Sequence, residues 1–292
     1  MDPHDADRLL IRADRIWPLL PPEEGLIEAS RHVLAYGLSY ELVLIPRRGQ
    51  RANLPGHGRP AFTGDKGSRI RAEEALAQDE LVVLTPNRFA FYEQQGLLWQ
   101  ASGFSREVPV ELLEAGFRLA EQGRGALLVN SIGASASIGQ AHGHLVRARS
   151  EVLEGLPMAV VGEERGLRLL ASDPGAGHPA WTVQVRGASA GDRARLVRAL
   201  LDLRTTASYH VLSQGDAAWV LPRRREIVEE VCPYAVGASE FFGRFVLPER
   251  ETYERLDGVA IELALAEASV PVTVDEFDAL RTLLPELYAR SR

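Results

Sequence analysis

The residues best suited to chemistry lie between positions 130 and 146, where the sequence is NSIGASASIGQAHGHLV. His142 and His144 are two residues apart, and residues two apart on a β-strand point to the same face of the sheet. Gln140 and Val146 have the same spacing, so a strand here would place all four side chains on one face. An imidazole is largely neutral near pH 7, where it can act as a nucleophile or a metal ligand.

Three interpretations of this histidine pair are open. The two rings can be solvated or bonded to the backbone, with no further role. They can bind a metal, but no third ligand with clear spacing accompanies them, and the single cysteine, Cys232, excludes a zinc site made of cysteines. They can act on a substrate as a nucleophile and its partner. The sequence therefore predicts neither a metal site nor a cofactor.

Polar side chains and glycines precede the histidines. Such a loop can direct backbone N–H groups and hydroxyls towards an anion. We therefore expect an anionic ligand beside the histidines. The members of this loop are Asn130, Ser131, Gly133, Ser135, Ser137 and Gly139.

Two similar series of elements can position this stretch. Each contains a helix and several short strands of β-branched and aromatic residues. The stretch DPGAGHP at 173–179 has the composition of a linker. The pattern predicts two related α+β units, residues 1–172 and 173–292. The first has a helix over 108–123, a pair of strands over 80–92 that is broken at Pro86 and Asn87, and strands over 96–100 and 126–130. The second has a helix over 191–204 and strands over 181–187, 209–214 and 217–224.

Both ends of the chain carry helical spacing of apolar residues. A stretch rich in arginine, glycine and proline at 47–68 predicts a long loop, and such loops in compact domains are often functional. The predicted terminal elements are helices over 5–17, 23–36, 249–268 and 273–290, with strands over 41–46 and 243–248.

Composition narrows the class of protein. The 292 residues carry a formal net charge of −7, which argues against a nucleic-acid scaffold held by phosphate contacts. The first residues lack the apolar core of a signal peptide, and no apolar run approaches the roughly 20 residues of a membrane-spanning helix. We expect a cytoplasmic protein without a nucleic-acid or membrane partner.

The stretch at 130–146 resembles the active-site segment of GDP-hexose phosphorylases and diadenosine tetraphosphate phosphorylases, members of the histidine-triad and galactose-1-phosphate uridylyltransferase superfamily. In those relatives Asn-Ser, a glycine-bearing loop and a Ser or Thr lead into His-x-His-x-Gln, whereas small histidine-triad hydrolases have His-x-His-x-His. The resemblance implies two histidine-triad-like units, each a mainly antiparallel sheet with flanking helices.

Two alignments with this motif are possible. The first matches His142 and His144 to the first two motif positions and leaves Val146 where Gln or His belongs. The second needs no gap after the Asn-Ser pair and puts Gln140 first, His142 at the nucleophile and His144 last. We favour the second, because it also places Ser137 on the hydroxyl position of the family.

The resemblance implies a covalent mechanism, in which His142 attacks the α-phosphorus of a nucleotide and forms a nucleotidyl-histidine. Gln140, His144, Ser135 and Ser137 would stabilise charge on the phosphoryl oxygens, while Asn130 and Ser131 shape the loop. VVLTPNRFAF resembles the strands that border the nucleotide pocket, so the candidates for base or ribose contact are Asn87, Arg88 and Phe89.

The implied activity is that of a nucleotidylyltransferase or phosphorylase. Its substrate would be an NDP-sugar or a dinucleoside polyphosphate, and its acceptor phosphate or a sugar phosphate. His144 also fits a nucleotide hydrolase, in which it would exchange a proton with water, and Gln140 fits a nucleotide-binding protein with a degraded site. Basic residues that could bind further phosphates are Arg47, Arg48, Lys66 and the run 223–225.

Overall fold

The fold was obtained as a computed structural model, which describes residues 11–50, 65–228 and 232–291. Its centre is a ten-stranded sheet in which every pairing is antiparallel. In spatial order the strands are β3 (Ala77–Gln78), β4 (Val82–Pro86), β5 (Gln95–Gln100), β7 (His142–Val146), β6 (Ala126–Asn130), β11 (Ser208–Gln214), β12 (Ala217–Arg223), β10 (Val183–Gly187), β9 (Leu167–Ser172) and β8 (Met158–Glu164).

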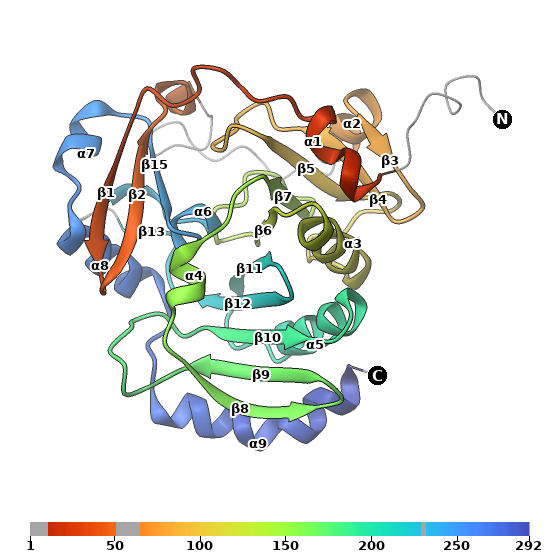
Figure 1. The fold of residues 1–292 in the computed structure, drawn as a ribbon, viewed down its shortest axis with the longest axis vertical. Coiled ribbons are helices and arrows are strands. Elements are labelled where there is room, and N and C mark those ends of the chain that lie inside the picture. Colours follow the sequence, from red (N-terminus) through yellow and green to blue (C-terminus); the bar gives the residue numbers. More distant parts are fainter. Residues whose placement is uncertain (1–10, 51–64, 229–231, 292) are drawn as a thin grey trace.

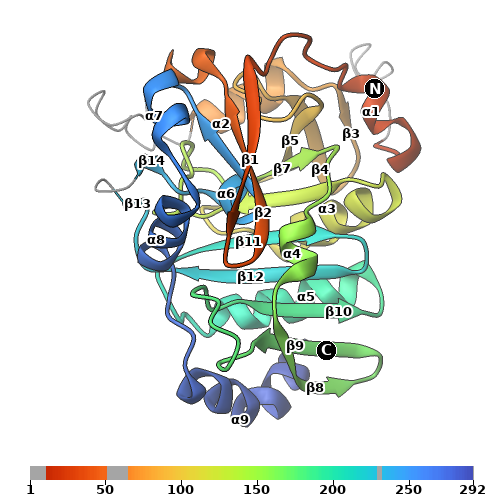
Figure 2. The ribbon, with the colours of Figure 1, turned by 60° about the vertical axis from the view of Figure 1, so that its left-hand side comes forward.

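Different layers cover the two faces of this sheet (Figures 1 and 2). Helices α3 (Val110–Gln122) and α5 (Ala190–Asp202) lie side by side on one face, and α9 (Val274–Arg290) runs along β8 at the far edge. The other face is covered by a small sheet of β1 (Ala29–Ala35), β2 (Leu38–Leu44) and β15 (Arg244–Leu247), with α4 (Glu151–Gly155), α6 (Ala238–Phe241) and α8 (Gly258–Ala268). β15 and β2 pair in parallel.

The remaining described elements are short. They are η1 (Ala13–Arg15), α1 (Ile16–Leu19), η2 (Pro46–Gln50), α2 (Asp65–Glu73), α7 (Arg250–Arg255) and the two-stranded ribbon of β13 (Ile227–Val228) and β14 (Cys232–Ala235).

Side chains of the central strands alternate between two hydrophobic cores. In β6, Leu127 and Val129 belong to the core beneath the helices, while Ala126 and Leu128 belong to the core beneath the small sheet. Burial of each such aliphatic side chain contributes about 1.5–3 kcal/mol to folding. This alternation fixes the register of the neighbouring strands, since a slip by one residue would turn every side chain into the opposite core.

The same alternation orients the histidine strand β7. A Cβ atom added at Gly143 would lie 2.6 Å from Cδ1 of Leu127, so any larger residue here would have to displace that leucine from the helix-side core. Val146 belongs to the opposite core, and His142 and His144 share its face by the period of two. The histidines therefore lie on the face that the small sheet only partly covers.

The predicted α+β class and mainly antiparallel sheet are confirmed. The predicted helix over 23–36 is wrong, because Ala29–Ala35 forms strand β1 and alternates between exposed and covered side chains. Tyr36 and Gly37 both have positive φ and form the tight turn of the hairpin that connects β1 to β2. The predicted single helix over 249–268 is two helices, since Asp257 caps α8 by accepting a hydrogen bond from the Ala260 N–H at 2.9 Å.

The predicted division at residues 172 and 173 falls within a continuous sheet. β6 of the first part pairs with β11 of the second, and β9 pairs with β10. The boundary itself stays a prediction. Of the predicted loop at 47–68, residues 51–64 lie outside the described part of the chain, including His57.

Candidate active site

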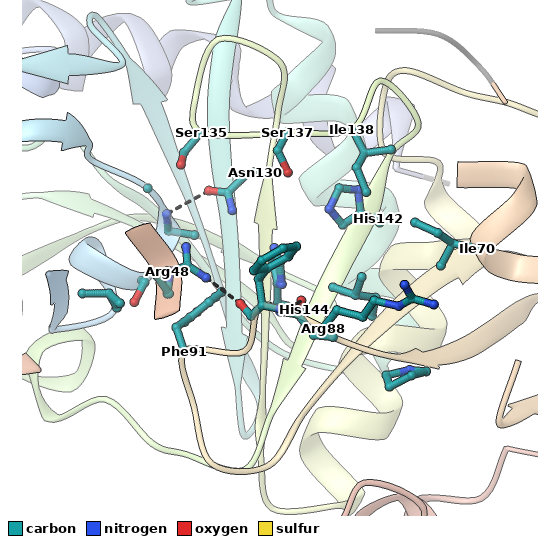
Figure 3. A pocket seen from close by; sticks show the side chains of 18 of the residues that line it. Arg48, Ile70, Arg88, Phe91, Asn130, Ser135, Ser137, Ile138, His142 and His144 are labelled. Atoms are coloured by element: carbon teal, nitrogen blue, oxygen red, sulfur yellow. Dashed lines mark hydrogen bonds between the residues drawn. The ribbon is translucent and has the colours of Figure 1, made fainter. Parts of the chain in front are cut away.

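A pocket of about 420 Å³ opens on the face of β7 that carries the histidines (Figure 3). Its walls come from β7, the loop after β6, the segment after β4, helix α2 and the residues around α6. Eight of the predicted site residues line it: Asn87, Arg88, Phe89, Asn130, Ser135, Ser137, His142 and His144. The structure thus brings together segments that are more than 40 residues apart in the chain.

His142 is held in one tautomer by its own backbone. Its ring is 4% exposed, and Nδ1 lies 2.9 Å from the main-chain oxygen of Gln140. A carbonyl only accepts, so the neutral ring carries its proton on Nδ1 and its lone pair on Nε2. The ring also stacks on Trp99 at a centroid distance of 4.7 Å. This is the state that a nucleophilic histidine requires.

His144 is held in the opposite way by a side chain from the neighbouring strand. Its Nδ1 lies 2.9 Å from Nε2 of Gln95, the first residue of β5. The two histidine rings meet edge to face, with centroids 5.4 Å apart. His142 and His144 therefore differ in hydrogen bonding although they share a strand and a face.

Three of the predicted residues do not reach the pocket wall. The Gln140 side chain packs beneath helix α2, where a Cβ atom at Gly67 would lie 2.5 Å from its Oε1, and its main-chain oxygen holds His142. Ser131 is buried, and its Oγ accepts a hydrogen bond from the Tyr209 N–H at 2.7 Å. Gly133 has a φ of +82° and turns the loop.

The polar residues of the loop after β6 combine structural and lining roles. Asn130 Oδ1 accepts a hydrogen bond from the Ala238 N–H at 2.8 Å, which fastens the end of β6 to α6. Ser135 adopts a φ of +70°, which is uncommon for a residue with a side chain, and its N–H donates to Glu226 Oε1 at 3.0 Å. The loop is thereby held with the Ser135 and Ser137 side chains at the pocket wall.

The segment after β4 forms another wall. Asn87 Oδ1 accepts a hydrogen bond from the Phe89 N–H at 3.1 Å and closes a turn, while Arg88 forms an ion pair with Glu74 at 3.0 Å. Phe89 is 40% exposed, so its ring lies outside the hydrophobic core. An exposed aromatic ring at a pocket rim can stack on a planar base.

Arg48 and Glu240 add charges to the same pocket. Arg48 donates to the Phe89 carbonyl at 2.6 Å, and its Cζ lies 4.9 Å from the centre of the Phe91 ring. Glu240 is 9% exposed, and desolvation raises the pKa of its carboxyl although the Gly237 N–H donates to it at 2.7 Å. Glu240 and Gln95 could not be predicted from the sequence, because each reaches the site only through strand and helix packing.

The predicted phosphate-binding cations separate into two groups. Lys66 and Arg48 line the pocket, whereas Arg47 pairs with Glu23 at 2.7 Å. Arg223 is buried at 2% exposure, so a role as an accessible phosphate ligand is wrong for it. Arg225 lies outside the pocket wall in an ion pair with Glu267 at 3.1 Å.

Within residues 11–50, 65–228 and 232–291, no cluster of three or more His, Cys, Asp or Glu side chains has the arrangement of a metal site. Over the same residues, no helix has the length and apolar character needed to cross a membrane.

Comparison with known proteins shows which solved structures have a similar fold. No family model and no curated protein matches the chain. Among solved structures, yeast Ap4A phosphorylase Apa2 in complex with Ap4A is similar with a TM-score of 0.61 and 14% sequence identity, over 87% of this chain and 100% of that one. The same phosphorylase in complex with AMP gives a TM-score of 0.61 over 84% of this chain and 89% of that one. The chain therefore has the fold expected from the resemblance of residues 130–146.

Proposed function

We propose that this protein is a nucleotidylyltransferase of the phosphorylase type that acts through a covalent nucleotide on His142. The observation that carries the proposal is the Nδ1–H tautomer of His142 within a pocket of about 420 Å³. Pockets of a few hundred Å³ are typical of small-molecule sites. The similar fold of a phosphorylase whose structures contain Ap4A and AMP supports a nucleotide as the ligand.

In the first step, Nε2 of His142 attacks the α-phosphorus of an NDP-sugar or a dinucleoside polyphosphate. The bond from that phosphorus to the bridging oxygen breaks, and the leaving phosphate group takes the electron pair. The positive charge on the phosphorylated ring is stabilised because Nδ1–H still donates to the Gln140 carbonyl.

The pocket wall supplies donors for the developing negative charge. The hydroxyls of Ser135 and Ser137 and the amide of Asn130 line the same side of the cavity (Figure 3). Arg48 and Lys66 provide positive charge for a substrate with several phosphates. Asn87, Arg88 and Phe89 would border the base or ribose, with the Phe89 ring available for stacking.

Protein labelling tests this function directly. The full chain is incubated with Ap4A or a set of NDP-sugars carrying ³²P at the α-phosphate, and acid-labile label on the protein is measured. Wild-type protein should become labelled and His142→Ala should not. Labelling of His142→Ala together with loss in His144→Ala would identify His144 as the nucleophile and favour the first alignment.

A hydrolase is the second candidate, because His144 stands where hydrolytic histidine-triad proteins also carry histidine. Product analysis separates the two activities. A phosphorylase should form a nucleoside diphosphate only when inorganic phosphate is present, whereas a hydrolase should form a nucleoside monophosphate without it. A protein that binds nucleotide but never becomes labelled would have a degraded site.

A further inference from the structure

The contact between Gln95 and His144 fixes the chemistry of the second pocket histidine. Oε1 of Gln95 accepts hydrogen bonds from the backbone N–H groups of Phe91 at 2.8 Å and Tyr92 at 3.2 Å. Backbone N–H groups only donate, so turning the amide round would lose two buried hydrogen bonds. The amide nitrogen therefore faces His144, and it donates to Nδ1 at 2.9 Å.

A ring that accepts at Nδ1 carries its neutral proton on Nε2. Protonating Nδ1 would set that new N–H against the N–H of Gln95, so the charged ring would lose the hydrogen bond. The neutral ring of His144 therefore donates through Nε2–H and has no lone pair on that nitrogen with which to accept a proton.

We propose that Gln95 is a positioning residue that makes His144 a permanent hydrogen-bond donor and thereby directs the nucleotidyl group to an anionic acceptor in preference to water. The acceptor class is inorganic phosphate or a phosphate monoester. This inference rests on the covalent nucleotidyl-His142 of the proposed function. Under this inference His144 acts like the glutamine that transferases carry at the matching position of the motif. Both side chains donate a hydrogen bond and neither accepts a proton.

The two acceptors differ in what they require. An unprotonated phosphate oxygen attacks the α-phosphorus, the bond from phosphorus to Nε2 of His142 breaks, and its electron pair returns to that nitrogen. The product is a nucleoside diphosphate or its ester, and no proton needs to move. Water attacking the same phosphorus must release a proton, which His144 cannot accept at Nε2. Arg48 and Lys66 line the pocket and favour entry of the anion.

The tautomer can be measured without any activity. Long-range ¹H–¹⁵N correlation spectra of the full chain with ¹⁵N-labelled histidine distinguish protonated from unprotonated ring nitrogens, and His142→Ala and His144→Gln variants assign the signals. We expect a proton on Nδ1 in His142 and on Nε2 in His144 at pH 7. A proton on Nδ1 of His144, or on both of its nitrogens, would overturn the inference whatever the enzyme transfers.

Gln95→Glu tests the consequence. One carboxylate oxygen can keep the bonds from Phe91 and Tyr92, and the other faces Nδ1 of His144. The neutral ring should then carry its proton on Nδ1 and a lone pair on Nε2, which can accept a proton from water. Gln100→Glu, at the other end of β5 and outside the pocket wall, is the matched control for charge.

Partition of the purified ³²P-nucleotidyl protein between water and inorganic phosphate is the activity measurement. General acid–base help is worth about 10²–10⁴-fold, so Gln95→Glu should raise the hydrolysis rate by about 10²-fold over Gln100→Glu. If the Gln95→Glu spectrum shows a proton on Nδ1 of His144 but the ratio of hydrolysis to phosphate transfer is unchanged, the role assigned to Gln95 is overturned. Absence of a labelled protein would instead refute the proposed function, while the wild-type spectrum still decides the tautomer.

Discussion

Two histidine-bearing regions of the central sheet share a face but differ in what covers them. His142 and His144 on β7 lie at the wall of the pocket. His210 on β11 pairs in register with Asn130 of β6, yet it is fully buried beneath Phe241 of α6, with ring centres 5.5 Å apart.

In the buried region, the charged side chain of Arg223 packs against His210 and forms hydrogen bonds with the groups around it. Arg223 donates to His210 Nε2 at 2.7 Å, to the Ala268 carbonyl at 3.0 Å and to the Arg225 carbonyl at 2.7 Å. Burial lowers the pKa of Arg223 to about 9 and the pKa of His210 well below its usual range. A histidine on this face can therefore meet a ligand only at the pocket, which the loop after β6 and helix α2 border.

The largest expected effect is the loss of chemistry in the open region. His142→Ala should reduce nucleotidyl transfer on the order of 10⁴-fold or more, since no other group can replace the nucleophile. Its thermal unfolding should stay close to that of the wild type. Labelling with α-³²P nucleotide measures the loss. Free imidazole should restore some turnover to His142→Gly and leave the turnover of a His210→Gly control unchanged.

The next effect is a loss of stability in the buried region. Arg223→Met leaves two carbonyls and the His210 ring without their donor, so the free energy of unfolding should fall by about 3 kcal/mol or more. Urea denaturation at pH 7 measures this. Arg225→Met removes an exposed ion pair and should change stability by less than about 1 kcal/mol. Equal effects in the two variants would contradict a structural role confined to Arg223.

Acid should weaken the fold through another histidine, His178, which lies outside both regions. Burial lowers the pKa of His178 to about 4, against 6.5 in the unfolded chain. The unfolded state therefore takes up a proton as the pH falls from about 6.5 to about 4, while the folded state does not. Between pH 7 and pH 5 this residue should lower the free energy of unfolding by about 2 kcal/mol.

Urea unfolding of His178→Gln at both pH values measures this contribution. The variant should lose that part of the pH dependence, whereas His32→Gln, an exposed control, should keep it. An equally steep dependence in His178→Gln would assign the effect to other groups.

The smallest expected effect is that of a chelator. Nucleotidyl transfer should change by less than about twofold after EDTA treatment, because the step at His142 uses only protein donors. Loss of labelling that zinc or iron restores would mean that a metal takes part in the pocket.

The motif at 130–146 was sufficient to predict the fold class and the placing of His142 and His144 on a strand at a pocket. Period-two spacing and small residues are local properties, and the close approach of Gly143 to Leu127 agrees with them. Strand β1 was missed, because its few apolar residues fit a helix and only pairing with β2 decides the outcome.

The rest of the pocket depends on tertiary packing. Glu240 reaches the pocket wall from α6 and Gln95 contacts His144 from β5, and no local pattern marks either of them. Arg223 belongs to a run of arginines that looks like a solvated surface, but strand β12 carries its side chain into the core next to His210. Which member of a charged run is buried follows from strand register and not from composition.

The pairing of β6 with β11 has a practical consequence for dissecting the chain. A fragment that ended after Ser172 would leave the backbone N–H and C=O groups of β6 unpaired along one side, next to the strand that carries the histidines. Exposed edges of this kind recruit strands from other molecules, so such a fragment should self-associate rather than act as a minimal enzyme. Co-expression with the complementary fragment would supply β11 and should restore a monodisperse species.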